Sequence, residues 1–158
     1  MGLDISVYNN IKKVADNSED GFLAYVLEES WEHKIKNLEK GASYDGDIIY
    51  TMSSGYSIHN AFRVNLLKMI GRDDLLDNGG RIDWDKLEIE KDIDFYELIL
   101  FADNEGCLDW EVSKTLSNQF MKHKEIAEKK MQGIFKSLYS DWTECFNNAK
   151  DKGVVVFH

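Results

Sequence analysis

The sequence predicts an α+β fold in which a small sheet, formed with both chain termini, packs against several helices. Three observations support this prediction. Leu3, Ile5 and Val7 alternate with polar residues, as in a half-buried strand. The long segment 110–151 has the spacing of an amphipathic helix, with apolar residues three and four apart. Residues 154–157 form a β-branched run, so the two ends of the chain are expected to pair in one sheet.

Short elements are expected after the first strand. The apolar run 22–27 fits either a strand or the start of a helix, and apolar residues then recur at helical spacing up to Gly41. Residues 48–52 have strand character. Residues 53–55 form a predicted loop that leads into a helix over 56–70, where four apolar residues line one face: Ile58, Phe62, Leu66 and Met69.

The second half begins with a highly charged segment, 73–91, whose two consecutive glycines predict a loop or short elements held by Trp84 and Leu87. Asp94 is placed to cap a short helix that ends at Gly106. Further along, Gly133 is expected to divide the helical segment into two helices, and Gly153 ends it. Because no proline, linker or repeat interrupts the chain, residues 1–158 are predicted to form a single domain.

Composition limits the class of protein. Of 158 residues, 43% are hydrophobic, which is enough for one core, and no apolar run reaches the roughly 18 residues of a membrane span. Two cysteines outside any C-x-x-C pattern, with no secretory leader, predict reduced thiols in a cytoplasmic protein. The first six residues also fit the N-myristoylation pattern, but their alternation favours a strand.

Negative charge is concentrated in one stretch of the chain. The net charge is −10, and residues 73–111 contain 14 acidic and 3 basic side chains. Such a block repels phosphate backbones, so we expect a protein partner with a basic surface and no direct binding of nucleic acid. A solvated face that only keeps the protein soluble is the alternative. The predicted partner-binding residues are Asp73, Asp74, Asp77, Asp83, Asp85, Glu88, Glu90 and Asp92.

The sequence contains no pattern that requires a metal, a cofactor or an enzymatic nucleophile. Its four histidines lack metal-ligand spacing, and the segment 103–109 matches a calcium loop only in being acidic with a glycine. A nucleophile elbow, a P-loop and a glycine-rich phosphate motif are all absent. We therefore expect no cofactor and no metal, and the sequence gives no positive evidence for an enzyme.

An alternative site for a small ligand surrounds the predicted helix start at Tyr56. A glycine loop that opens a helix presents amide groups to an anion, and Asn60 and Arg63 follow on the same helix face. The paired carboxylates Asp103 and Glu105 add capacity for acid-base chemistry. The same residues also fit an ordinary helix cap and an ion pair. The predicted ligand-binding set is Ser54, Gly55, Tyr56, Asn60, Arg63, Asp103, Glu105 and His158.

Four short motifs are spread over most of the chain: Met-Gly-Leu-Asp-Ile at residues 1–5, Gly55 and Tyr56 before Asn60 and Arg63, Phe-x-Asp-x-Glu-Gly at 101–106, and Gly-x-Val-x-Phe-His at 153–158. In these motifs the chain resembles a group of short, uncharacterised bacterial and phage proteins. The group usually has Trp beside the helix Arg and Cys between the two acids, where this chain has Phe62 and Asn104. The resemblance implies a common fold and a phage or mobile-element setting, with no known activity.

Two functional hypotheses follow. The first is a non-enzymatic acidic binding protein, a phage or mobile-element inhibitor of the anti-defence type, for example anti-CRISPR, that occupies a basic surface of a nucleic-acid-handling partner. The second is a small-ligand or nucleotide-sequestering protein, or a hydrolase, with its site around Tyr56, Arg63, Asp103 and His158. The sequence does not specify the oligomeric state.

Overall fold

A computed structural model describes residues 2–15, 21–24, 35–100 and 106–158. It contains one five-stranded antiparallel sheet in the order β2-β3-β1-β5-β4. The strands are β1 (Gly2–Val14), β2 (Phe22–Leu23), β3 (Ser43–Gly55), β4 (Gly106–Leu108) and β5 (Val154–Phe157). The helices are α1 (Tyr56–Met69), the 3₁₀ turn η2 (Asp73–Leu75), α2 (Trp84–Ile89), α3 (Tyr96–Leu100), α4 (Trp110–Lys122), α5 (Lys124–Lys130) and α6 (Ile134–Ala149).

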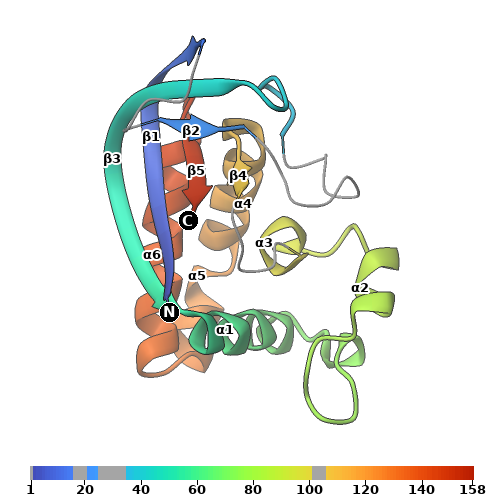
Figure 1. The fold of residues 1–158 in the computed structure, drawn as a ribbon. Helices are drawn as coiled ribbons and strands as arrows, with labels where there is room; N and C mark the ends of the chain where they lie inside the picture. The colour runs from blue at the N-terminus through green and yellow to red at the C-terminus, as the bar shows by residue number, and fades with distance from the viewer. Residues whose placement is uncertain (1, 16–20, 25–34, 101–105) are drawn as a thin grey trace.

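The two ends of the chain pair with each other, which confirms the predicted α+β fold. Strand β1 pairs with β5 from Ile5 opposite Phe157 to Tyr8 opposite Val154 (Figure 1). The alternating apolar residues of β1 are buried, whereas Asp4 between them is exposed. The periodicity of the first strand therefore sets which of its faces meets the core.

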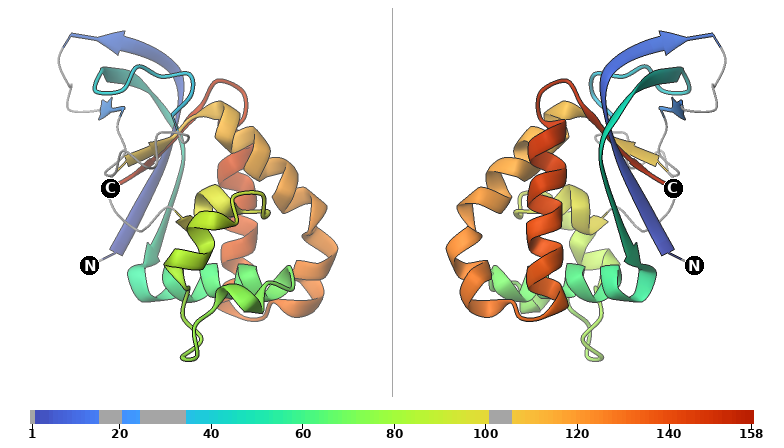
Figure 2. Two further views of the ribbon diagram at one scale, coloured as in Figure 1. Left: turned by 90° about the vertical axis from the view of Figure 1, so that its right-hand side faces the viewer. Right: turned by 90° about the vertical axis from the view of Figure 1, so that its left-hand side faces the viewer.

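Helices α4 and α6 cover one face of the sheet, as Figure 2 shows. In that core the Trp142 ring stacks on Phe146 at 5.4 Å and on Phe157 at 5.8 Å between centroids. A smaller cluster on the opposite face includes Phe22 and Val154. Because β5 is covered on both faces, its apolar run has no polar alternation.

Strands β1 and β3 form a long ribbon that bends away from the helices at its far end (Figure 2). Their register shifts between Asn9 and Lys12, where Asn10 has a positive φ of 51°. Such an irregularity bends a strand and increases its twist. A Cβ on Gly46 would lie 2.7 Å from the carbonyl oxygen of Asn9, so this close approach requires glycine.

Several local predictions are wrong, whereas the helix at 56–69 is confirmed. Residues 53–55 complete β3 and do not form a loop, because they pair with the start of β1. Gly106 begins β4 and does not end a helix. The predicted anchor Trp84 is 41% exposed, although Leu87 is buried.

The C-terminal helical segment contains three helices, not two. It breaks at His123 as well as before Gly133, which has a φ of 56°. Helix α6 ends at Ala149, four residues before Gly153, whose added Cβ would lie 2.8 Å from the Cα of Ala149. Within the run 22–27, Phe22–Leu23 forms β2, and residues 25–27 lie outside the described residues, as does Trp31. The helical spacing predicted up to Gly41 is wrong for residues 35–40, which are not helical. No helix in the described ranges has the length and apolar character that a membrane crossing needs.

Candidate functional site

Residues 72–92 form a protruding acidic lobe, made of η2, a turn and α2. Figure 1 shows it beyond the end of α1, away from the sheet. Its shape follows from local hydrogen bonds: Asp77 Oδ1 accepts from the amides of Gly79 and Arg81, at 2.8 and 2.9 Å, and so closes the turn. The Asp83 side chain caps α2 by accepting from the amide of Lys86. Leu75 and Leu87 are buried and attach the lobe to the core.

All eight predicted partner-binding carboxylates lie on this lobe, together with four basic side chains. Four of the carboxylates have a basic partner within 4 Å: Asp74 and Glu90 with Arg72, Asp77 with Arg81, and Asp83 with Lys86. The hydrogen bond from Arg72 holds the pKa of Asp74 below its ordinary value. The other four are exposed and have no basic partner within 4 Å among the described residues: Asp73, Asp85, Glu88 and Asp92.

Beyond the lobe, two acidic residues of the stretch 73–111, Asp94 and Asp109, form hydrogen bonds within the fold. Asp94 accepts from Lys122 Nζ at 2.9 Å and lies 2.6 Å from His123 Nε2. It is not the predicted helix cap, because α3 begins only at Tyr96. Burial alone would raise the pKa of Asp94, but these hydrogen bonds outweigh it and the pKa lies below its ordinary value. The acidic surface is therefore narrower than the acidic stretch of sequence.

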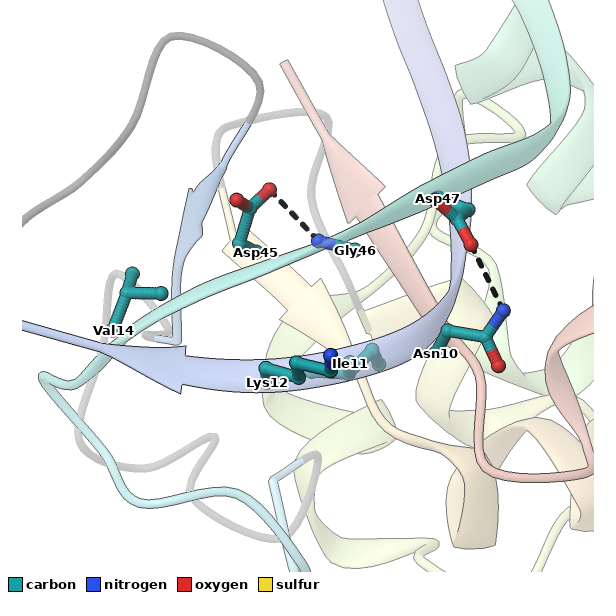
Figure 3. Close-up of a pocket in the computed structure, with 7 residues that line it drawn as sticks. All are labelled: Asn10, Ile11, Lys12, Val14, Asp45, Gly46 and Asp47. Atoms are coloured by element: carbon teal, nitrogen blue, oxygen red, sulfur yellow. Dashed lines mark hydrogen bonds between the residues drawn. The ribbon is translucent and has the colours of Figure 1, made fainter.

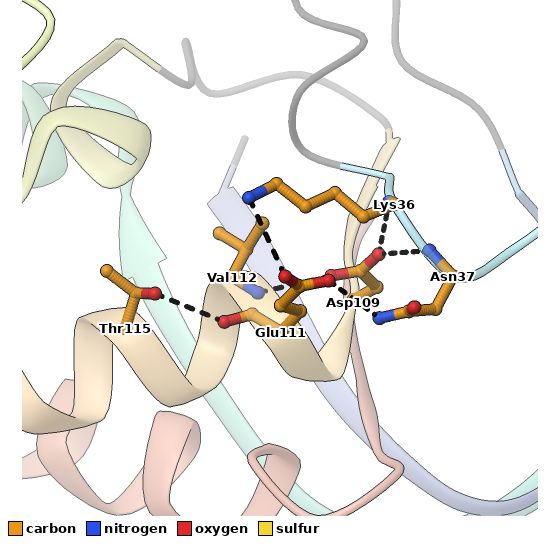
Figure 4. Close-up of polar contacts among 6 residues, drawn as sticks. All are labelled: Lys36, Asn37, Asp109, Glu111, Val112 and Thr115. Atoms are coloured by element: carbon orange, nitrogen blue, oxygen red, sulfur yellow. Dashed lines mark hydrogen bonds and ion pairs between the residues drawn. The ribbon is translucent and has the colours of Figure 1, made fainter.

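Asp109 is the clearest example of a structural carboxylate (Figure 4). It is fully buried at the start of α4, where it accepts from the amide of Val112 at 3.2 Å. It also accepts from the amides of Lys36 and Asn37, the latter at 2.8 Å. Glu111, next to it, is exposed and pairs with the Lys36 side chain at 4.0 Å. Asp109 thus ties the segment before β3 to α4.

The predicted ligand-binding residues are spread over several elements. Ser54 and Gly55 end β3, and Tyr56 begins α1. Gly55 has ordinary extended dihedrals, φ −69° and ψ 143°, so it does not form a glycine-specific loop. His158 follows β5, and its amide donates to the carbonyl of Asp4 at 2.8 Å. Asp103 and Glu105 lie outside the described residues.

Asn60 and Arg63 are the members of this set that line one cavity of about 740 Å³, between α1 and the inner side of the acidic lobe. The Arg63 side chain is 2% exposed, donates to the carbonyl of Ile99 at 2.8 Å and donates to Asn60 Oδ1. Its guanidinium carbon lies 5.2 Å from the centre of the Trp84 ring. The other lining residues are Ala61, Val64, Asn65, Lys68, Gly80, Arg81, Ile82 and Trp84.

Sequence reasoning missed Lys68, Arg81 and Trp84 in this cavity. Asn60, Val64 and Lys68 are spaced four residues apart, which places them on one face of α1. This spacing could have predicted from the sequence that Lys68 lies on the same helix face as Asn60. Arg81 and Trp84 reach the same cavity only because the turn of the lobe folds back, with Leu76 bridged to Ile82. That second contribution depends on tertiary structure.

A second cavity, of about 630 Å³, lies on the β1–β3 ribbon (Figure 3). Its polar groups bond to one another: Asn10 Nδ2 donates to Asp47 Oδ2, and the amide of Gly46 donates to Asp45 Oδ1. Figure 3 shows these side chains spread along the two strands, without converging on one point. This arrangement does not resemble a ligand site.

No group of three or more His, Cys, Asp or Glu side chains in the described part of the chain is arranged to hold a metal ion. Comparisons with protein-family models, with curated proteins and with solved structures give no match. The resemblance to the proteins that begin with Met-Gly-Leu-Asp-Ile therefore stays a prediction, and functional inference rests on the lobe and on the cavity beside it.

Proposed function

We propose that this chain is a non-enzymatic binding protein whose acidic lobe covers a basic surface of a protein partner. The supporting observation is the set of four exposed carboxylates on the lobe that have no basic partner within 4 Å among the described residues. Their charge acts toward solvent, so it is available to attract a cationic surface and to speed association with it.

Folding does not account for Glu88, one of these carboxylates. It lies in the last turn of α2, where the helix dipole disfavours negative charge. It also lies three residues from Asp85 on the same short helix, a like-charge spacing that costs a few tenths of a kcal/mol. Next to Glu88, Ile89 is 81% exposed. A single exposed apolar side chain is common on protein surfaces, and a bound partner would bury this one.

A nucleic-acid-handling enzyme is the partner class that this surface fits best. Such an enzyme holds phosphates in a groove rich in lysine and arginine, and an acidic lobe can occupy that groove in place of nucleic acid. The phage or mobile-element setting implied by the sequence resemblance is consistent with an inhibitor of a host defence enzyme. Within this proposal, inhibition requires binding alone and no reaction.

The test compares two double variants that change the net charge equally. Asp85→Asn with Glu88→Gln removes two negative charges from the lobe, and Glu125→Gln with Glu128→Gln removes two from exposed carboxylates of α5. Proteins captured from a lysate of the source organism are identified at several salt concentrations, and each is then assayed for nucleic-acid binding with and without this chain.

We expect a partner whose capture weakens with salt and is at least about tenfold weaker for the lobe variant, with little change for the α5 variant. Displacement of nucleic acid from that partner would support the inhibitor role. If the lobe variant captures the same partner with unchanged affinity, the acidic lobe is not the binding surface and the proposal fails.

A further inference from the structure

The cavity between α1 and the acidic lobe has the opposite charge from its surroundings. Three cationic side chains line it, Arg63, Lys68 and Arg81, and no carboxylate of the described residues does. The lobe as a whole carries eight carboxylates and four basic side chains. A cavity whose charged lining residues are cations, in the most acidic region of the chain, favours an anionic group within it.

An aromatic ring and two side-chain amides complete the lining. Trp84 is 41% exposed in the cavity wall, with the Arg63 guanidinium against it. Asn65 Nδ2 donates to the carbonyl of Ala61 at 2.8 Å, which leaves its oxygen as an acceptor. Asn60 accepts from Arg63 through its oxygen, which leaves its amide nitrogen as a donor. One donor and one acceptor near an indole suit the edge and face of a nucleobase.

We propose that this cavity binds a nucleoside monophosphate, with the base against Trp84 and the phosphate between Lys68 and Arg81. The volume of about 740 Å³ lies within the usual range for small-ligand sites. Lys68 is exposed at the end of α1, and the exposed side chain of Arg81 forms a surface ion pair with Asp77 at 3.4 Å. Surface pairs of this kind are weak, so Arg81 can turn toward a phosphate at little cost. This inference does not depend on the proposed function.

The negative field of the lobe does not oppose this assignment strongly. Asp74, Asp83 and Glu90 already have basic partners outside the cavity lining, and at physiological salt the screening length is about 8 Å. Contacts inside the cavity therefore outweigh the field of the outer carboxylates. Gly80, which lines the cavity at a φ of 75°, adds no side chain that would block the phosphate.

The experiment is calorimetric titration with the four common nucleoside 5′-monophosphates, the matching nucleosides, inorganic phosphate and a short single-stranded oligonucleotide. Lys68→Gln tests the phosphate contact, and Lys91→Gln is its control, because Lys91 is an exposed lysine of the lobe outside the cavity lining. Trp84→Leu removes the ring, and Trp84→Phe keeps one. Thermal unfolding of each variant checks that it folds.

We expect at least one monophosphate to bind more tightly than its nucleoside and than phosphate alone. Lys68→Gln should weaken the binding of that monophosphate about fivefold and leave the binding of the nucleoside unchanged, since one charge-assisted contact to the phosphate is lost. Trp84→Leu should weaken the binding of both the monophosphate and the nucleoside about tenfold. Trp84→Phe, which keeps an aromatic ring, should retain most of the affinity. The control Lys91→Gln should change binding by less than about twofold.

Three results would overturn the inference: no monophosphate binds at millimolar concentration, Lys68→Gln and Lys91→Gln weaken binding equally, or only the oligonucleotide binds. Partner capture separates this proposal from the preceding one. A chain that fails to bind monophosphates but still captures its partner through the lobe would refute only the cavity assignment.

Discussion

Replacing Asp109 with alanine should destabilise the protein even though this carboxylate belongs to the acidic stretch. The fully buried side chain accepts from three backbone amides, two of them at 2.8 and 3.2 Å. A hydrogen bond to a charged group contributes about 1.5–3 kcal/mol, and a lost helix cap costs about 1 kcal/mol. Water can reach the freed amides of Lys36 and Asn37, whose side chains are exposed. We therefore expect a loss of about 3–4 kcal/mol, below the simple sum.

Urea unfolding followed by circular dichroism measures this loss directly, and the melting temperature should fall by about 10 °C for a domain of this size. Glu111→Ala is the control, because Glu111 is exposed and pairs with Lys36 only at 4.0 Å. It should cost less than about 1 kcal/mol. If Asp109→Ala also costs less than about 1 kcal/mol, the carboxylate does not tie residues 36–37 to α4 and the reasoning is wrong.

Three further predictions concern the fold. Because the pKa of Asp94 is lowered in the folded protein, its carboxylate stabilises the native state above the ordinary carboxyl pKa of about 4, and this contribution is lost as the pH falls through the lowered value. The difference in unfolding free energy between the wild type and Asp94→Asn should therefore vanish at low pH. A difference that stays constant with pH would contradict this. Burial raises the pKa of the Cys145 thiol, and Cys107 is also buried, so neither should react with Ellman's reagent before unfolding. Gly153→Ala should cost about 2 kcal/mol or more by chevron or urea analysis, because its Cβ would contact backbone at 2.8 Å, whereas Gly55→Ala should stay within about 0.5 kcal/mol.

Hydrophobic periodicity was sufficient to predict the parts of the fold where one face is buried over many residues. The alternation in β1 and the unbroken run of β5 indicated their pairing, and the spacing of 56–69 indicated α1. Strand β4 has three residues, all buried, which is too short to show any period. The break at His123 has no glycine or proline to indicate it.

The count of charged residues along the sequence located the acidic lobe, but it did not predict which carboxylates are buried in the fold and which face solvent. The sequence does not distinguish Asp109, which is buried, from Asp85, which faces solvent, because burial depends on segments distant in the chain. The cavity was predictable only in part: α1 supplies Asn60 and Arg63 at helical spacing, whereas Trp84 arrives through the turn of the lobe. Trp84 was predicted as a core anchor because large aromatic residues are usually buried.

The outward carboxylates of the lobe and the cations that line the cavity are separate sets of residues, so the two proposed binding activities should be nearly independent. Asp85→Asn with Glu88→Gln removes two negative charges that do not line the cavity. The double variant should change the affinity for a nucleoside monophosphate only through the long-range electrostatic field. We expect the affinity to rise less than about twofold at physiological salt and more at low salt. Titration of this variant and of Lys68→Gln, singly and combined, measures the coupling. A gain in affinity that persists near 0.5 M salt would show that these carboxylates contact the ligand, which contradicts the division of the lobe into an outer acidic surface and an inner cationic cavity.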